Sequence, residues 1–330
     1  MTICIVGGSG FIGTRLVKRL IDSGEHDLKI VDKNLSVHYP ELCSLSDVRY
    51  IKDLENSIAN DSVLINLAAE HRDNVSPQTL YHDVNVVGSE NLCRVADEKN
   101  IKTIIFTSSV AVYGFAPLNT SEDGDIEPFN EYGKTKYKAE KVFINWQSQS
   151  PEDRSLTIIR PTVVFGEQNR GNVYNLLKQV AIKKLIMVGD GKNRKSIAYV
   201  ENVAAFIQFN MGFKPGVHIY NYVDKPDFTM NELVINTNRI LGRSYKTQLK
   251  IPFKIAYLIG ILFDYLAFIF RKKFIISSIR VKKVCTNSVY SSSVQTTGFI
   301  PPISIEMALE KTIHHEFIDS NADSRFFFTE

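Results

Sequence analysis

The feature that most constrains the fold is a glycine-rich turn near the start of the chain. A short β-branched run at residues 3–6 is followed by Gly7-Gly8-Ser9-Gly10-Phe11-Ile12-Gly13, and apolar residues at three- and four-residue spacing come next. Glycines permit a tight turn and a close approach of the backbone to phosphate groups. A helix that begins at such a turn presents free N–H groups to an anion. The sequence therefore predicts a strand, turn and helix that bind the pyrophosphate of a dinucleotide.

The alternation of strand and helix patterns continues through the first half of the chain. Short apolar runs recur at 3–6, 28–31, 63–67, 103–107 and 156–159, and helical patterns lie at 11–23, 81–99 and 131–148. Such alternation is typical of parallel strands joined by crossover helices. We therefore predict an α/β protein, with a doubly wound parallel Rossmann sheet at residues 1–165 and a smaller α+β substrate-binding domain at 166–330. Part of residues 196–225 is expected to return to the Rossmann domain.

Asp32 ends the second predicted strand and indicates which dinucleotide is bound. A carboxylate at this position accepts hydrogen bonds from the ribose hydroxyls of the adenosine and repels a 2′-phosphate. The sequence therefore favours NAD over NADP as the cofactor.

Composition argues against several classes of protein. The chain has 39 Lys and Arg against 36 Asp and Glu, a balance that gives no argument for nucleic-acid binding. The cysteines Cys4, Cys43, Cys93 and Cys285 lie far apart and form no C-x-x-C pair. We therefore expect no disulfide framework and no metal site, and this cysteine usage is typical of the reducing cytoplasm.

Tyr132 and Lys136 form a candidate catalytic pair. They are four residues apart in a predicted helix and therefore share one face. A neighbouring ammonium stabilises a tyrosinate and lowers the pKa of the phenol, so that it can act as a base. Ser109 follows the predicted strand at 103–107, which places a hydroxyl at the carboxyl edge of the sheet, where ligands bind in open α/β folds.

Together these residues resemble the extended short-chain dehydrogenase/reductase family, and within it the sugar-nucleotide epimerases. The resemblance implies that Tyr132 is the base, that Ser109 hydrogen-bonds the reacting hydroxyl and that Lys136 holds the nicotinamide ribose. The implied reaction is a transient oxidation of a sugar at C4, after which the 4-keto sugar turns over and is reduced on its other face. Inversion then occurs without net redox change.

One departure from the family pattern bears on the chemistry. Val110 and Ala111 stand where the family's 4,6-dehydratases carry an Asp-Glu pair, which disfavours dehydration. A 4-ketosugar reductase stays open, although Asp32 argues against the NADPH that many reductases use.

The glycine motif and the resemblance together give the expected binding residues. For NAD they are Gly7, Gly10, Phe11, Ile12, Gly13, Asp32, Asp47, Val48, Leu67, Ala68, Ala69, Asn85, Tyr132, Lys136, Pro161 and Val163. For the substrate they are His71, Ser109, Asn172, Arg194, Lys195 and Arg280, with Lys195 preferred over Arg194 for a diphosphate.

Four segments, at 68–73, 160–177, 220–226 and 278–283, resemble a narrower group. This group comprises bacterial epimerases that act on N-acetylglucosamine linked to undecaprenyl diphosphate. The resemblance implies interconversion of N-acetylglucosaminyl- and N-acetylgalactosaminyl-diphospho-undecaprenol for O-antigen and lipopolysaccharide biosynthesis. Two further alternatives stay open beside the 4-ketosugar reductase. One is a UDP-GlcNAc or UDP-glucose 4-epimerase acting on soluble nucleotide sugars in the cytoplasm, and the other is a non-catalytic NAD-binding regulator.

Residues 251–283 give separate support for a lipid-linked substrate. Residues 251–270 are apolar apart from Lys254, Asp264 and the tyrosines, and a basic cluster follows. An apolar helical face beside basic residues is typical of attachment to an anionic membrane surface. We expect peripheral contact with the cytoplasmic face of the inner membrane, because Asp264 would lie near the centre of a spanning helix. A buried helix or an oligomer contact is the alternative.

The helical patterns at 81–99 and 131–148 bear on the oligomeric state. In this family the corresponding helices form a two-fold contact, so a homodimer is expected by analogy.

Overall fold

A seven-stranded parallel sheet organises the larger part of the chain. The computed structural model describes residues 1–330 except 73–74, 245–248, 271–276, 320–325 and 329–330. The strand order is β10-β6-β5-β4-β1-β2-β3, and every pairing in this sheet is parallel. The strands are β1 (Ile3–Val6), β2 (Leu28–Asp32), β3 (Cys43–Leu45), β4 (Val63–Asn66), β5 (Thr103–Thr107), β6 (Ser155–Pro161) and β10 (Gly216–Tyr222). The predicted doubly wound sheet is confirmed.

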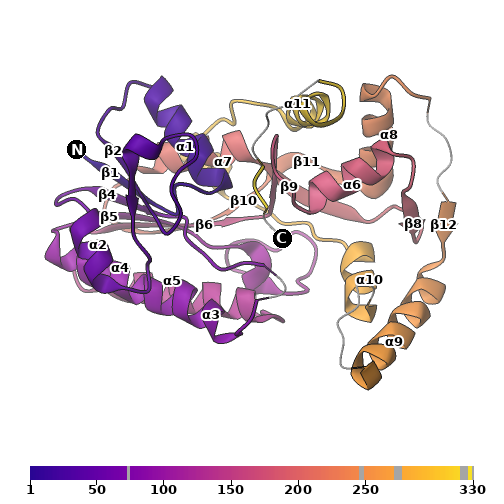
Figure 1. The fold of residues 1–330 in the computed structure, drawn as a ribbon, viewed down its shortest axis with the longest axis horizontal. Coiled ribbons are helices and arrows are strands. Elements are labelled where there is room, and N and C mark those ends of the chain that lie inside the picture. Colours follow the sequence, from indigo (N-terminus) through magenta and orange to yellow (C-terminus); the bar gives the residue numbers. More distant parts are fainter. Residues whose placement is uncertain (73–74, 245–248, 271–276, 320–325, 329–330) are drawn as a thin grey trace.

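Helices cover both faces of this sheet (Figure 1). The helices α1 (Phe11–Asp22) and α7 (Val200–Asn210) lie on one face, and α2 (Ile51–Ser57), α4 (Gly88–Glu98) and α5 (Glu131–Ser148) lie on the other. A short α3 (Thr79–His82) and a π-helical segment (Asp83–Val87) lead into α4, so the helix predicted at 81–99 changes its winding. Because both faces are covered, β1 and β4 are buried at every position, which explains their continuous apolar runs.

The second half of the chain builds smaller sheets and alternates between the two parts. The three-stranded sheet has the order β11-β9-β7, and the two-stranded sheet pairs β12 with β8. The elements are β7 (Val163–Phe165), α6 (Asn172–Ala181), β8 (Ile186–Val188), β9 (Arg194–Tyr199), β11 (Asp224–Thr229), α8 (Met230–Ile240), β12 (Leu249–Ile251) and α11 (Ile305–Phe317). β7 lies before residue 166 but belongs to the three-stranded sheet. α7 and β10 lie after residue 166 but belong to the part built on the seven-stranded sheet.

Two helices form an arm at the lower right of Figure 1, which we call the α9–α10 arm. It consists of α9 (Phe253–Phe270) and α10 (Ser278–Cys285). A Cβ added at Gly260 would lie 2.8 Å from Ser278 Cα, so the two helices touch there. Asp264 Oδ2 accepts a hydrogen bond from Ser278 N at 3.1 Å. The one acid in α9 therefore caps the start of α10.

The apolar side chains of α9 face outward. Only Ala256 and Gly260 of this helix are buried, whereas Leu258 is 65% and Phe268 83% exposed. This excludes a buried core helix within the described part of the chain. Among the described helices, α9 alone is long and apolar enough to cross a membrane, judged by length and composition.

Candidate active site

The glycine turn between β1 and α1 has the geometry that its sequence predicts. Gly7 has φ +77°, and a Cβ at this position would lie 2.6 Å from Ala68 N. Leu67 N donates a hydrogen bond to Val6 O at 2.8 Å, which keeps the loop after β4 against the turn. Any side chain at Gly7 would force these two loops apart. Gly7 is therefore needed for the turn to pack against the loop after β4, in the tight form that is typical of a pyrophosphate-binding turn.

Asp32 lies beside this turn. Its Oδ2 accepts a hydrogen bond from Ser9 N at 3.1 Å, and its Oδ1 accepts one from Asn34 N at 2.9 Å. Burial raises the pKa of Asp32, and the two backbone donors offset part of this rise. The structure thus places a partly shielded carboxylate next to the predicted pyrophosphate position, which is where a ribose-binding acid is needed.

The next predicted NAD contacts follow β3. Asp47 pairs with Arg49, whose Nη2 lies 2.6 Å from Asp47 Oδ2. Burial raises the pKa of Asp47, but the hydrogen bonds and charge of Arg49 outweigh it and hold the pKa below its usual value. Val48 packs against Gly88, where a Cβ would lie 2.7 Å from Val48 Cγ2. Direct contact of this segment with adenine stays a prediction.

Ser109 and Tyr132 are brought together from different elements. Ser109 follows β5 and begins the 3-10 turn η3 (Val110–Tyr113), where its Oγ accepts a hydrogen bond from Ala111 N at 3.1 Å. Tyr132 lies in the first turn of α5 and has a side-chain hydrogen bond with Ser109. A Cβ at Gly133 would lie 2.4 Å from Ala111 O, so the start of α5 is packed against η3. This contact fixes the distance between the two hydroxyls.

Lys136 is buried one turn further along α5. It is 1% exposed, and its Nζ lies 4.2 Å from the centroid of the Phe106 ring. Burial lowers the pKa of Lys136 to about 7, although the charge of Glu140 raises it. We expected Lys136 to lower the pKa of Tyr132, but burial raises this pKa by more than the Ser109 hydrogen bond lowers it. The expected lowering of the Tyr132 pKa is therefore wrong for the protein chain alone, because desolvation is the largest effect on the Tyr132 phenol.

Glu140 and Arg160 support the site, and neither was identified as a support from the sequence. Arg160 Nε and Nη2 donate to Glu140 at 2.9 and 2.7 Å, and Arg160 Nη1 donates to Tyr113 Oη at 2.6 Å. The Lys136 to Glu140 spacing of one helical turn was the available signal. Arg160 comes from β6, far along the chain, and only the folded sheet brings it to α5.

Asn85 also acts as a support. Its Oδ1 accepts from Glu70 N at 2.8 Å, and its Nδ2 donates to Glu70 O and to Thr135 Oγ1, each at 3.0 Å. The amide therefore ties the loop after β4 to α5. These contacts position the site, and direct contact of Asn85 with NAD stays a prediction.

His71 is another predicted substrate residue. It is exposed in the loop after β4, with Nδ1 3.4 Å from Ala69 O. Desolvation is the largest cause that lowers its pKa, and the charge of Lys136 lowers it further. The structure therefore brings His71 and Lys136 within electrostatic reach of each other.

The remaining predicted substrate residues lie in the second part of the chain. Asn172 is exposed as the first residue of α6, and Arg280 is exposed on α10. Arg194 Nη1 donates to Asp227 O at 2.9 Å. Lys195 Nζ donates to Lys283 O at 2.8 Å and to Thr286 O at 2.6 Å, at the end of α10. These hydrogen bonds of Lys195 hold the end of α10, so contact of Lys195 with a diphosphate stays a prediction.

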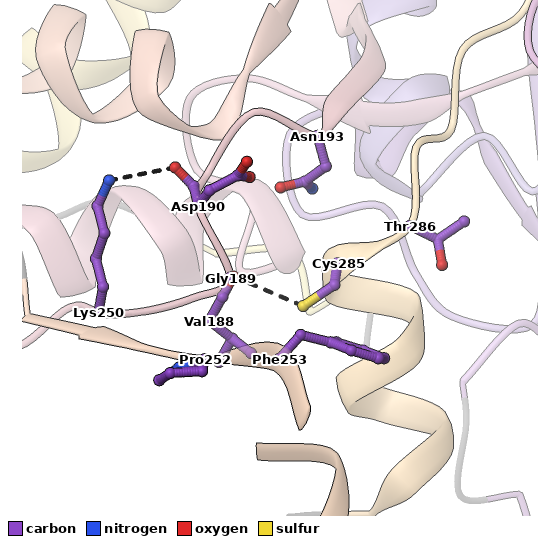
Figure 2. A pocket seen from close by; sticks show the side chains of 9 residues that line it. All are labelled: Val188, Gly189, Asp190, Asn193, Lys250, Pro252, Phe253, Cys285 and Thr286. Atoms are coloured by element: carbon purple, nitrogen blue, oxygen red, sulfur yellow. Dashed lines mark hydrogen bonds between the residues drawn. The ribbon is translucent and has the colours of Figure 1, made fainter. Parts of the chain in front are cut away.

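A cavity of about 670 Å³ lies at the base of the arm. Figure 2 shows Phe253 and Cys285 along it, with Lys250 Nζ donating to Asp190 O at 3.2 Å. The other lining residues are Val188, Gly189, Asn193, Pro252 and Thr286. None of the three catalytic residues lines it, so this cavity is separate from the Ser109 and Tyr132 site.

The C-terminal part of the chain also reaches the cofactor turn. The Phe327 ring centroid lies 5.7 Å from that of Phe11, and Phe327 N donates to Gln168 O at 2.9 Å. No sequence pattern indicated this contact, since nothing local in the terminal segment points to α1.

The residues present fit a bound NAD. The space at Gly7 admits backbone only, and Asp32 stands beside it with the catalytic residues at the same carboxyl edge of the sheet. In the described residues no group of three or more His, Cys, Asp or Glu side chains could hold a metal ion.

The chain can now be assigned to a class. A model of the NAD dependent epimerase/dehydratase family matches residues 3–221, more than half of the chain. The chain belongs to this family, NAD is its cofactor, and the resemblance to extended short-chain dehydrogenases/reductases is confirmed. A relative from Escherichia coli O157:H7, the N-acetyl-alpha-D-glucosaminyl-diphospho-ditrans,octacis-undecaprenol 4-epimerase, is 44% identical over 330 residues, which cover 99% of each chain.

Solved structures agree with this fold. The UDP-glucose 4-epimerase of Thermotoga maritima, solved with UDP-glucose, superimposes with a TM-score of 0.75 at 21% identity and covers 96% of this chain and 98% of its own. The UDP-glucose 4-epimerase of Thermus thermophilus, solved with NAD, gives a TM-score of 0.71 at 18% identity with the same coverage.

Proposed function

We propose that this chain is an NAD-dependent sugar 4-epimerase that interconverts N-acetylglucosaminyl- and N-acetylgalactosaminyl-diphospho-undecaprenol. The observation that carries this proposal is the 44% identity over essentially the whole chain to a relative of that name. The similarity spans 99% of this chain and so includes the α9–α10 arm. The activity belongs to the isomerases and serves the synthesis of surface polysaccharides such as the O-antigen.

The chemistry follows from the positions of the catalytic residues. Tyr132, as the tyrosinate, takes the proton of the sugar 4-hydroxyl, and the Ser109 hydroxyl holds that oxygen in place. The glycine turn and Asp32 would hold NAD, which would supply the hydride acceptor for C4 and the hydride donor for the other face of the sugar. Tyr132 then gives its proton back to the new 4-hydroxyl, so no net redox change remains. The adjacent Val110 and Ala111 offer no acid or base for elimination at C5 and C6.

The α9–α10 arm is proposed to lie on the cytoplasmic surface of the inner membrane. Its exposed apolar residues face outward from the body, and Arg280, Lys282 and Lys283 follow on α10. A spanning α9 would draw Asp264 and the start of α10 into the bilayer, because Ser278 N is bonded to that carboxylate. Surface attachment avoids this cost. The other basic residues expected to contribute, 271–273, lie outside the described residues.

The oligomeric state is a separate proposal. The helices α4 and α5 pack side by side on one face of the sheet, and we propose that their outer surfaces form the contact of a homodimer. Sedimentation of the purified protein tests this, and a monomer at micromolar concentration would contradict it.

A paired epimerisation assay tests the substrate. The purified protein is given UDP-N-acetylglucosamine in one reaction and undecaprenyl-diphosphate N-acetylglucosamine in membranes in the other. Conversion of the lipid-linked sugar with little conversion of the nucleotide sugar is expected. Efficient conversion of the nucleotide sugar alone would contradict the proposal and place the protein among soluble nucleotide-sugar epimerases.

A further inference from the structure

Two partly exposed aromatic rings stack at the edge of the catalytic site. The centroids of Phe115 and Phe129 lie 4.7 Å apart with an angle of 24° between the ring planes. Phe115 is 39% and Phe129 40% exposed. Apolar rings left open at a binding site are candidates for contact with a ligand.

The backbone fixes this pair beside the reacting groups. Phe115 comes just after η3, which begins at Ser109, and Phe129 comes just before α5, which carries Tyr132. A Cβ at Gly114 would lie 3.7 Å from a ring carbon of Phe129, so the two segments are in contact. The rings therefore lie on the same two segments that hold the catalytic hydroxyls.

Two lysines from the other part of the chain cover the rings. Lys282 Nζ lies 4.7 Å from the Phe115 centroid, and Lys283 Nζ lies 4.9 Å from the Phe129 centroid. Both lysines are on α10, which Lys195 holds at its end and Asp264 at its start. The position of α10 is thus set by contacts other than the aromatic rings. Its two ammonium groups can leave the rings without displacing the helix.

The contacts made by these ammonium groups are replaceable. A cation over an exposed ring is held weakly, whereas charge-assisted hydrogen bonds between an ammonium and a phosphate oxygen are strong. A diphosphate near α10 would draw the lysines away and leave the two rings open. An apolar chain attached to that diphosphate would then find an apolar surface in place of the cations.

We infer that Phe115, Phe129, Lys282 and Lys283 form a binding subsite for a polyprenyl diphosphate. The lysines bind the diphosphate, and the rings bind the first isoprene units. The inference rests on the proposed function and extends it to the lipid part of the substrate. It is favoured over a nucleoside on the rings because α10 packs against α9 at Gly260, and α9 exposes apolar side chains such as Leu258 and Phe268.

Chain-length dependence tests this subsite. The substrates are N-acetylglucosamine diphosphate esters of a single prenyl unit and of farnesol, and the KM ratio between them is measured. The wild-type protein is expected to bind the farnesyl ester more tightly. The F115S/F129S protein should lose most of this preference, with a KM for the farnesyl ester about tenfold higher, because each CH₂ contributes to burial. F115L/F129L should keep the preference, since leucine preserves an apolar surface.

Substitution of the two lysines tests the diphosphate contact, and two control variants test whether the effects are specific to the subsite. K282Q/K283Q should raise KM for both esters, because both carry the diphosphate. The equally exposed Phe209 on α7 and the exposed Lys214 give the controls F209S and K214Q, which should leave both KM values unchanged. The single variants F115S and F129S, each at a partly exposed position, keep the test valid if the double variant fails to fold.

The outcomes separate the two proposals. A wild-type chain-length preference that F115S/F129S retains would overturn the subsite while leaving the lipid-linked epimerase intact. A wild-type protein that converts UDP-N-acetylglucosamine and neither ester would overturn the proposed function itself.

Discussion

Glu140 and Arg160 form a buried ion pair directly behind the catalytic lysine. Arg160 Nη2 lies 2.7 Å from Glu140 Oε2, with the two side chains 5% and 0% exposed. Glu140 is one helical turn beyond Lys136, and its charge acts against the effect of burial on that ammonium. The pair therefore joins α5 to β6 and supplies a negative charge near Lys136.

Replacing Glu140 with glutamine is expected to lower the free energy of unfolding by about 3–5 kcal/mol, because Arg160 would keep a buried and unpaired charge. Chemical denaturation measures this. D22N removes the exposed partner of Lys18 and should cost less than about 1 kcal/mol. Equal effects of the two variants would show that the buried pair contributes no more than a surface pair.

Y132F should reduce turnover by roughly 100- to 10,000-fold, the usual contribution of a positioned acid–base group. The ring remains in place, so the fold and bound NAD should be retained, as measured by circular dichroism and by NAD content after gel filtration. S109A should also lower kcat, through loss of the hydrogen bond to the reacting hydroxyl. Wild-type turnover in Y132F would refute the assigned base.

The stability of the NAD-free chain should depend on pH through Lys136. Its pKa is about 7 when folded and near 10.5 when unfolded, so the unfolded chain binds more protons between these values. The free energy of unfolding should therefore gain a contribution from Lys136 as the pH rises from 7 toward 10.5. Below pH 7 the full cost of burying the charged ammonium remains.

Denaturation of the wild type and of K136M at pH 7 and pH 9.5 measures this contribution. The wild type should gain at least about 1 kcal/mol more than the variant over this interval. An identical gain in both proteins would show that Lys136 is not the responsible group.

G7A and G24A separate two effects of a glycine at positive φ. Gly7 has φ +77° and Gly24 has φ +90°, but an added Cβ meets Ala68 N at 2.6 Å only in the first case, and nothing within 4 Å in the second. G24A should cost about 1–2 kcal/mol from the left-handed backbone. G7A should cost more and should also lose NAD, because the turn must shift. Full NAD occupancy in G7A would contradict the assignment of this turn.

Attachment of the α9–α10 arm to membranes can be measured with vesicles of anionic phospholipid. L258D/F268D should abolish binding, since both side chains are exposed on α9 and their replacement leaves the core intact. Binding of the wild type should also weaken as salt is added. I300D changes an equally exposed apolar residue in the segment before α11 and should bind normally. Unchanged binding of L258D/F268D would contradict the attachment proposal.

Much of the nucleotide-binding half could be predicted because its signals are local. The apolar run of β1, the glycine turn and the helical spacing of α1 each depend on neighbours within a few residues. The same holds for Tyr132 and Lys136, which share a helix face whatever surrounds them. The substrate part was harder. The return of part of residues 196–225, which form α7 and β10, was expected, but no local pattern indicated that β7 belongs to the smaller sheet.

By itself the sequence determined the parallel sheet, the dinucleotide turn with its acidic partner, and the types of catalytic residue. These depend on backbone geometry and on short periodicities. Only the tertiary structure decided where charged groups are buried and which groups they bind. In the folded chain Arg160 pairs with Glu140, the Lys195 ammonium donates to a backbone carbonyl at the end of α10, and apolar side chains of α9 are exposed. Desolvation and hydrogen bonding act between residues that are distant along the chain, so they are settled only when the fold brings those residues together.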